Sequence, residues 1–344
     1  MFSRINDEGK YSPENSRSLA SQGFGRDGQK ESPISCRVDY PDCRTFISMV
    51  ESTGAKANGK PKTGTGYTNE KHASAKVGRN RFRGGGHDVM EQKWPYTLWI
   101  VRHGQSAGNI ARIEAEAAGL HTIDITMRDV DVPLSPLGER QAEALGQWFG
   151  KMPRNVNPTV ILCSPYLRAK QTVRIVMDIA GLSENVTSLI TDERLREKEF
   201  GILDRLTMHG IREKYPELSE QRDHVGKFYF RPPGGESWCD VILRLRSTID
   251  TIIREYRRER VLIVSHQVIL NCFRYLLERM DEQQILSIDS VDDVPNCGVN
   301  SYEFDSTLGR HGKLVPRLIN FVLPLQDAGA QVTREPDVQT APKS

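Results

Sequence analysis

The chain has 344 residues, of which 38% are hydrophobic and 27% are charged, and its formal net charge is +2. This near balance gives no general attraction for nucleic acid or an anionic membrane, so we expect neither as a partner. The sequence shows no apolar run near the roughly 20 residues of a membrane span, no apolar secretory segment at its start and no Cys-x-x-Cys pair. We therefore expect a cytoplasmic protein with reduced thiols.

Residues 1–90 differ in composition from the rest of the chain. Lys and Arg outnumber Asp and Glu here by 15 to 10, and the segment has 12 glycines but one leucine, Leu19. Such a segment cannot bury enough apolar surface to offset the loss of backbone entropy, about 1–2 kcal/mol per residue. We expect residues 1–90 to be a disordered, basic, glycine-rich extension, and Met90 is a candidate start of translation.

One segment of this extension resembles a nucleotide-binding motif. Residues 54–60, GAKANGK, match the first seven positions of a phosphate-binding P-loop. Pro61 stands where that motif needs Ser or Thr, and proline also removes a backbone donor. We therefore expect no nucleotide binding here.

From Tyr96 onward, short apolar runs alternate with amphipathic segments. In chain order, the pattern predicts a strand over 97–104, helices over 109–118 and 137–149, a strand over 159–163, helices over 164–180 and 236–257, a strand over 261–265, a helix over 267–277, and a hairpin of 301–304 with 313–321. The Ser-Pro pairs at 135–136 and 164–165 are typical of helix starts. Alternating strands and helices predict an α/β three-layer sandwich around a mostly parallel sheet. We expect this domain over 91–325 and a flexible tail over 326–344.

Residues with suitable chemistry follow three of the predicted strands. Arg102 and His103 end the first, Arg168 lies one turn beyond the second, and His266 follows the third. The carboxyl ends of parallel strands meet at one edge of a sheet, so we expect these side chains to converge. One arginine can donate two parallel hydrogen bonds to two phosphate oxygens, and neutral histidine can act as a nucleophile near pH 7. The pattern predicts a site for a tetrahedral dianion.

Two details of that site remain open from the residues alone. An acid for the leaving oxygen could come from Glu193, Glu197 or Glu199, in the loop over 192–201. Only four residues separate Cys163 from Arg168, whereas a cysteine phosphatase needs five, so we interpret Cys163 as a buried structural residue.

Five segments together resemble one enzyme family. RHGQSAGN at 102–109 is similar to the signature of the histidine phosphatase superfamily, which has the phosphoglycerate-mutase-like fold. Four further segments resemble later motifs of that family, in the same order. They are LSPLGERQA at 134–142, SPYLRAKQT at 164–172, LREKEFG at 195–201 and VSHQ at 264–267. The resemblance covers about residues 97–305.

The resemblance implies a role for each matching residue. His103 would be the nucleophile that becomes phosphohistidine, and Glu197 would be the general acid that protonates the leaving alcohol. The residues implied to bind the phosphoryl group are Arg102, Asn109, Arg168, His266 and Gln267. Water would then hydrolyse the phosphoenzyme, and the family needs neither a metal ion nor a cofactor. We expect a metal-independent phosphomonoester hydrolase acting on a small phosphorylated metabolite.

Two related activities are the alternatives. Residues 222–238 resemble the corresponding segment of fructose-2,6-bisphosphatases, and Arg222 and Lys227 could bind a second phosphate. The chain departs from that pattern at Asn271, where an arginine is usual, and at Trp238, where a tyrosine is usual. A phosphoglycerate mutase is the other alternative, although mutases carry a longer lid than the two helices expected between the acid loop and the second histidine.

Further expectations concern the surroundings of the site. The segment over 113–132 follows the nucleophile and is expected to cover the site. Its acidic side chains would disfavour very anionic substrates or would simply be solvated; they are Glu114, Glu116, Asp124, Asp129 and Asp131. A catalytically inactive phosphate-binding or interaction protein is the alternative from a different functional class, and the intact set of site residues argues against it.

Overall fold

The structure is a computed structural model that describes residues 92–291 and 293–334. The predictions for residues 1–90, including the P-loop-like segment and Met90, lie outside the described residues, as do those for 335–344. In the described part of the chain, no helix combines the length and the apolar character that crossing a membrane requires.

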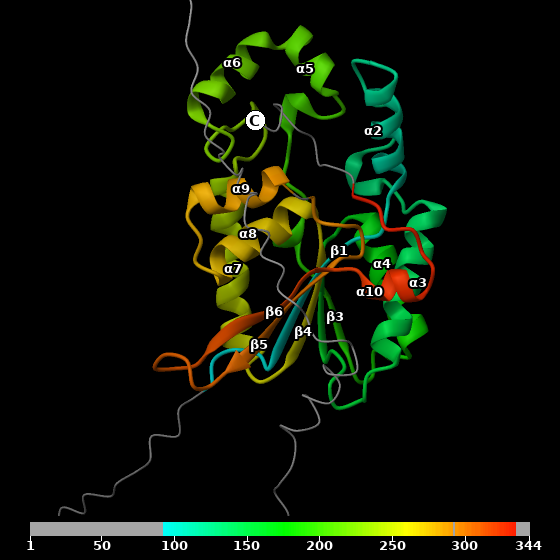
Figure 1. The fold of residues 1–344 in the computed structure, drawn as a ribbon, viewed down its shortest axis with the longest axis vertical. Helices are drawn as coiled ribbons and strands as arrows, with labels where there is room; N and C mark the ends of the chain where they lie inside the picture. The colour runs from blue at the N-terminus through cyan, green and yellow to red at the C-terminus, as the bar shows by residue number, and fades with distance from the viewer. Residues whose placement is uncertain (1–91, 292, 335–344) are drawn as a thin grey trace, which may run out of the picture. The chain divides into compact units, whose positions relative to one another are not determined.

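A six-stranded sheet lies at the centre of the domain (Figure 1). Its strands are β1 (Thr97–Arg102), β2 (Val160–Cys163), β3 (Ser188–Thr191), β4 (Arg260–Ser265), β5 (Val299–Asp305) and β6 (Lys313–Phe321). The spatial order is β3-β2-β4-β1-β5-β6. The first four strands are parallel, whereas β5 and β6 form the expected antiparallel hairpin at one edge. The prediction of a mostly parallel sheet is confirmed.

Helices cover both faces of the sheet (Figure 1). The helices are α2 (Ala107–Ala117), α3 (Pro136–Gly150), α4 (Leu167–Ala180), α5 (Met208–Lys214), α6 (Pro216–Val225), α7 (Trp238–Glu255), α8 (Gln267–Leu277), α9 (Glu282–Val291) and α10 (Leu323–Asp327). Ile100 of β1 joins the core cluster that includes Leu245 of α7 and Phe273 of α8. Its neighbour Trp99 points the other way, and its ring centroid lies 5.7 Å from that of Phe149 in α3. Successive side chains of the strand thus face opposite sides of the sheet, and helices pack against both sides to form three layers.

The two predicted Ser-Pro helix starts have different outcomes. Ser135 caps α3 as expected, because its Oγ accepts a hydrogen bond from the Gly138 amide at 3.0 Å. The prediction for Ser164 is wrong, since α4 begins three residues later with Tyr166 as its N-cap. The Ser164 hydroxyl lies instead 2.7 Å from Nε2 of His266. Its side chain therefore reaches the candidate site, while its Oγ also accepts from the amide of the N-cap Tyr166 at 3.3 Å.

The segment between the acid loop and the second histidine holds three helices, and not the two that were expected. The short helices α5 and α6 precede α7. Helix α6 has no apolar stripe, and Arg222 is its only buried residue, so hydrophobic periodicity could not reveal it.

Residues beyond Leu325, where we expected the domain to end, still contact the domain. Nε2 of Gln141 donates to the Gln331 carbonyl at 2.9 Å and to Thr333 Oγ1 at 2.9 Å.

Candidate active site

The loop after β1 is held tightly against the start of α3. The amide of His103 donates to the Ser265 carbonyl at 2.9 Å, and the amide of Gly104 donates to Thr172 Oγ1 at 3.1 Å. Gly104 and Gly138 face each other so closely that a Cβ on Gly104 would overlap the Gly138 backbone. Glycine is therefore needed for this approach. The packing fixes the direction in which the His103 side chain leaves the sheet edge.

The hydrogen bonds of His103 define which ring nitrogen carries the proton. Its Nδ1 lies 2.6 Å from the Gly104 carbonyl oxygen, which can only accept, so Nδ1 is protonated. Nε of Arg168 donates to His103 Nε2 at 3.2 Å. Because arginine can only donate, Nε2 carries the lone pair. The imidazole is therefore neutral, with its nucleophilic nitrogen beside a guanidinium.

Burial and nearby positive charge keep both site histidines neutral. Burial is the largest cause that lowers the pKa of His103 well below its ordinary value of 6.5, and the charges of Arg168 and Arg102 add to it. Burial, followed by the charge of Arg168, also lowers the pKa of His266 well below 6.5. Protonation would place a third positive charge among the two arginines, which is unfavourable in a desolvated site.

These lowered pKa values predict a loss of stability in acid. Below pH 6.5 the unfolded chain takes up protons at His103 and His266, while the native site does not. The free energy of unfolding should therefore fall by up to about 1.4 kcal/mol per pH unit for each of the two histidines. Urea denaturation between pH 7.5 and pH 5 measures this slope, and His103→Asn should reduce it. A stability that stays level or rises as the pH falls would contradict the assignment.

His266 lies between His103 and a buried carboxylate. The ring centroids of His103 and His266 are 5.1 Å apart. His266 Nε2 faces the Ser164 hydroxyl, while its Nδ1 has no hydrogen-bond partner and lies 3.7 Å from Oε2 of Glu197. Glu197 is only 5% exposed, and its Oε1 accepts from the Lys198 amide at 2.8 Å. One buried carboxyl thus stands beside the two histidines.

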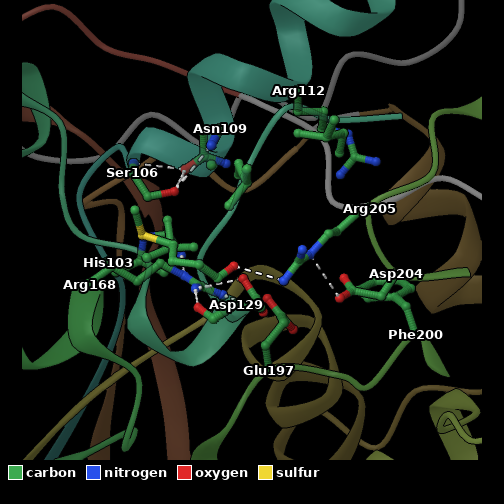
Figure 2. Close-up of a pocket in the computed structure, with 15 residues that line it drawn as sticks. His103, Ser106, Asn109, Arg112, Asp129, Arg168, Glu197, Phe200, Asp204 and Arg205 are labelled. Carbon is green, nitrogen blue, oxygen red and sulfur yellow. Dashed lines mark hydrogen bonds and ion pairs between the residues drawn. The ribbon is translucent and has the colours of Figure 1, made fainter. Parts of the chain in front are cut away.

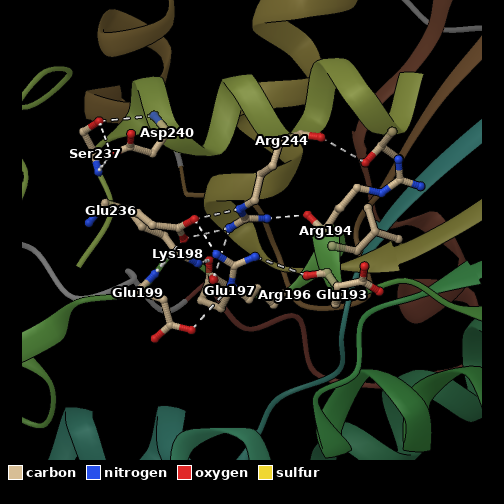
Figure 3. A network of polar contacts seen from close by, with 12 residues as sticks. Glu193, Arg194, Arg196, Glu197, Lys198, Glu199, Glu236, Ser237, Asp240 and Arg244 are labelled. Carbon is tan, nitrogen blue, oxygen red and sulfur yellow. Dashed lines mark hydrogen bonds and ion pairs between the residues drawn. The ribbon is translucent and has the colours of Figure 1, made fainter. Parts of the chain in front are cut away.

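A network of ion pairs holds the backbone of Glu197 in place (Figure 3). Arg244 of α7 donates through Nη2 to the Glu197 carbonyl at 3.2 Å and through Nε to Glu236 at 2.9 Å. Glu236 also accepts from Arg196 at 2.7 Å and from the Glu199 amide at 3.1 Å. These contacts lower the pKa of Glu236 in spite of its burial. The loop that carries Glu197 is therefore anchored on both sides of that residue.

Four of the predicted site residues line one open cavity (Figure 2). They are His103, Asn109, Arg168 and Glu197. The cavity measures about 690 Å³, a volume that includes space open to solvent. Asn109 comes from α2, where its Oδ1 accepts from the Ser106 amide at 2.9 Å.

Three other predicted residues lie behind or beside the cavity. Arg102 is fully buried, and its Nη1 donates to the Val294 carbonyl at 2.6 Å. His266 is also fully buried, beneath His103. The structure does not bring Gln267 to the cavity, because its Nε2 donates to Asp293 Oδ1 at 2.8 Å. Among the three acid candidates, only Glu197 lines the cavity, whereas Glu199 is exposed and lies 3.3 Å from the Tyr166 hydroxyl.

Arg222 and Lys227, which under the bisphosphatase alternative could bind a second phosphate, lie away from the cavity. Neither residue lines the cavity. Lys227 is paired with Asp289 of α9, and Arg222 is buried in α6. The basic side chains on the far side of the cavity are instead Arg112 of α2 and Arg205, which donates to the Met127 carbonyl at 2.9 Å.

Part of the segment over 113–132 lines the cavity and contributes a residue that the motifs did not predict. Asp129 forms a two-pronged ion pair with Arg168, at 2.9 Å from Nη1 and 3.3 Å from Nη2 (Figure 2). The same Nη1 also donates to the Asp129 backbone oxygen at 2.7 Å. The acidic composition of this segment was the only sequence signal. Asp129 thus occupies the guanidinium face that a phosphate would use.

Comparison with known proteins agrees with this geometry. The model of the histidine phosphatase superfamily, branch 1, matches residues 98–311. This chain belongs to the histidine phosphatase superfamily. It is 30% identical over 178 residues to the probable phosphoglycerate mutase GpmB of Yersinia enterocolitica, covering 51% of this chain and 71% of that protein.

Solved structures share the fold of this histidine phosphatase. The YhfR protein of Bacillus stearothermophilus is 25% identical, with a TM-score of 0.50 over 66% of this chain and 97% of its own. A mycobacterial glucosyl-3-phosphoglycerate phosphatase with inorganic phosphate is 19% identical, with a TM-score of 0.50 over 67% of this chain and 99% of its own. The predicted phosphoglycerate-mutase-like fold and the membership in this enzyme family are therefore confirmed.

Proposed function

We propose that this histidine phosphatase hydrolyses phosphomonoesters of small metabolites through a phosphohistidine at His103, without a metal ion. The observation that carries the proposal is the state of His103: Nδ1 is protonated toward Gly104, and Nε2 carries a lone pair beside Arg168. A neutral imidazole so oriented can attack phosphorus, and this splits one difficult displacement into two easier ones.

Positive charge and donors around His103 would stabilise the transferred group. Arg102 and Arg168 act as the fixed cations that lower the pKa of His103, and both would offset the charge of a phosphoryl group. The Ser164 hydroxyl can donate to His266 Nε2, which leaves the Nδ1 hydrogen of His266 as a donor toward the site. Asn109 lines the same cavity. These groups are in place before the substrate binds, which favours the transition state.

Glu197 would supply the proton for the leaving oxygen. In the first step, the phosphorus–oxygen bond of the ester breaks as Nε2 of His103 bonds to phosphorus, and the carboxyl of Glu197 gives its proton to the alcohol. In the second step, the carboxylate takes a proton from water as the water oxygen displaces His103. The carboxyl is buried next to both histidines, which suits this exchange of roles.

Release of inorganic phosphate in EDTA tests the proposal. p-Nitrophenyl phosphate, 3-phosphoglycerate, fructose 2,6-bisphosphate and simple sugar phosphates are the substrates to compare, and their ranking would identify the substrate class. The similarity to proteins named phosphoglycerate mutase makes mutase activity the second candidate. Conversion of 3-phosphoglycerate to its isomer, dependent on 2,3-bisphosphoglycerate and without phosphate release, would favour the mutase. Inactivity of the folded protein in both assays would overturn the proposal.

The ion pair between Asp129 and Arg168 predicts a gain in substrate affinity when its charge is removed. Asp129→Asn should lower KM for phosphomonoesters by about 1.4- to fivefold, since an ion pair with a half-exposed carboxylate contributes about 0.2–1 kcal/mol that the substrate must overcome. Steady-state kinetics at fixed ionic strength measure the change. Asp131→Asn is the matched control, because Asp131 pairs with the exposed Arg128. A higher KM in Asp129→Asn would show that Asp129 assists substrate binding.

A further inference from the structure

Three side chains outside the cavity meet at the protein surface. Oε2 of Glu213 lies 2.8 Å from His121 Nε2 and 3.8 Å from His209 Nε2, and the two histidine ring centroids are 4.6 Å apart. One ligand atom from each residue lies within 4.8 Å of the other two. We propose that His121, His209 and Glu213 form a binding site for a divalent transition-metal ion of the zinc type.

The ligand set and its spacing suit such an ion. Imidazole nitrogen and carboxylate oxygen are zinc ligands with bonds of about 2.0–2.2 Å, so neighbouring ligand atoms of a tetrahedral site lie about 3.3 Å apart. The separations of 2.8 Å and 3.8 Å lie on either side of that value. The three side chains are 51–62% exposed, so they can rotate by the small amount needed. Water would fill the fourth position.

The backbones that carry these ligands are already locked together. His209 and Glu213 stand one turn apart on α5 and share a face of that helix. The carbonyl of His121 accepts a hydrogen bond from the Thr207 amide at 3.1 Å, directly before α5. Gly210 lies so close to the His121 backbone that a Cβ there would overlap it. The site therefore joins two packed segments and needs no large movement to form.

A simple ion pair explains only part of the cluster. Glu213 needs one histidine for an ion pair, and His121 already lies at 2.8 Å. The His209 ring, whose centroid lies 4.6 Å from that of His121, is not needed for that pair. A metal ion instead uses both rings in their neutral form together with the carboxylate. The pairing of two histidines with one acid is thus better accounted for by a metal ion.

The position of the site gives it a structural consequence. The two joined segments continue into the lining of the cavity, to which one contributes Ile123 and Ile125 and the other Asp204 and Arg205. The amide of Ile123 already donates to the Arg205 carbonyl at 2.8 Å. None of the three proposed ligands lines the cavity. The ion would therefore hold these two neighbouring segments of the lining together without contacting the reacting atoms.

Zinc binding to the full chain tests this site without any turnover. After treatment with EDTA and its removal, the protein is titrated with Zn²⁺ in competition with a fluorescent zinc indicator. We expect His121→Ala and His209→Ala each to weaken zinc binding by about tenfold or more, because each removes a ligand. His311→Ala, which removes an exposed histidine of the β5–β6 hairpin, should leave the affinity unchanged. Hydrogen exchange should show Zn²⁺ slowing exchange at the Ile123 and Thr207 amides.

Two results would overturn the proposal. Equal zinc affinity in the wild type and in both ligand variants would mean that the cluster binds no zinc. Zinc affinity lost only in His103→Ala would place the ion at the buried histidines. Thermal unfolding in EDTA verifies that each variant is folded. His121, His209 and His311 are exposed, so replacing them should leave the fold intact. Since binding is measured directly, its failure is distinct from a failure of the proposed hydrolysis.

Discussion

His103→Ala should remove phosphate release from every phosphomonoester tested, with kcat/KM falling on the order of 10³-fold or more. The reason is that the hydrogen bonds of His103 leave a lone pair on its Nε2, beside Arg168. Binding need not be lost with it, because Arg168, Asn109 and Glu197 still line the cavity. Comparison of kcat and of phosphate inhibition in the two proteins separates chemistry from binding.

His311→Ala is the matched control for this variant. This variant makes the same change from histidine to alanine in an exposed hairpin, and the activity of the variant should equal that of the wild type. Circular dichroism and urea denaturation show whether His103→Ala is folded. A folded His103→Ala protein that retains more than a small fraction of the activity would rule out the phosphohistidine route. Cys163 would not take over, since burial raises the pKa of its thiol to about 12.

Glu197→Gln should have an effect that depends on the leaving group. With alkyl phosphates, such as sugar phosphates, the rate should fall by about 10²–10⁴-fold, because the alcohol needs a proton as it leaves. With p-nitrophenyl phosphate the first step should hardly change, since nitrophenolate leaves without protonation. The structure supports this role, because Glu197 is buried, lines the cavity and lies 3.7 Å from His266. Burst kinetics with both classes of substrate measure the contrast.

Glu199→Gln provides the matched control for the acid. Glu199 is two residues away in the same loop, but its side chain is exposed and approaches Tyr166 and Arg196. The variant should retain nearly full activity with both substrate classes. Equal losses with alkyl and nitrophenyl esters in Glu197→Gln would instead indicate that Glu197 only holds His266 in position. A leaving-group effect in Glu199→Gln would reassign the acid.

Local sequence patterns predicted the framework of the domain because they reflect burial. The runs that became β1, β2 and β4 are almost fully buried, and their residues therefore read as continuous apolar strands. Parallel packing of those strands then brings Arg102, His103 and His266 to one edge. Two of the helices that escaped prediction, α6 and α9, bury few apolar side chains. Their positions depend on tertiary contacts and not on their own hydrophobic pattern.

Side-chain roles at the site were less predictable, because they depend on partners far away in the chain. Ser164 resembled a helix cap, but its hydroxyl lies against His266, which follows β4 far away in the chain. Gln267 stood in a family motif, yet its amide pairs with Asp293. Asp129 has no motif of its own, and only the folded insertion brings its carboxylate to Arg168. Such contacts are set by the tertiary structure.

Trapping of the phosphoenzyme tests the central claim most directly. Glu197→Gln with p-nitrophenyl phosphate suits this purpose, because phosphoryl transfer to the enzyme needs no acid, whereas hydrolysis of the intermediate needs the missing base. Rapid quenching in alkali followed by peptide mass spectrometry should find one phosphoryl group, labile to acid, on the peptide that contains His103. A phosphoryl group on any other residue would contradict the account. So would a burst of nitrophenol without any phosphorylated peptide.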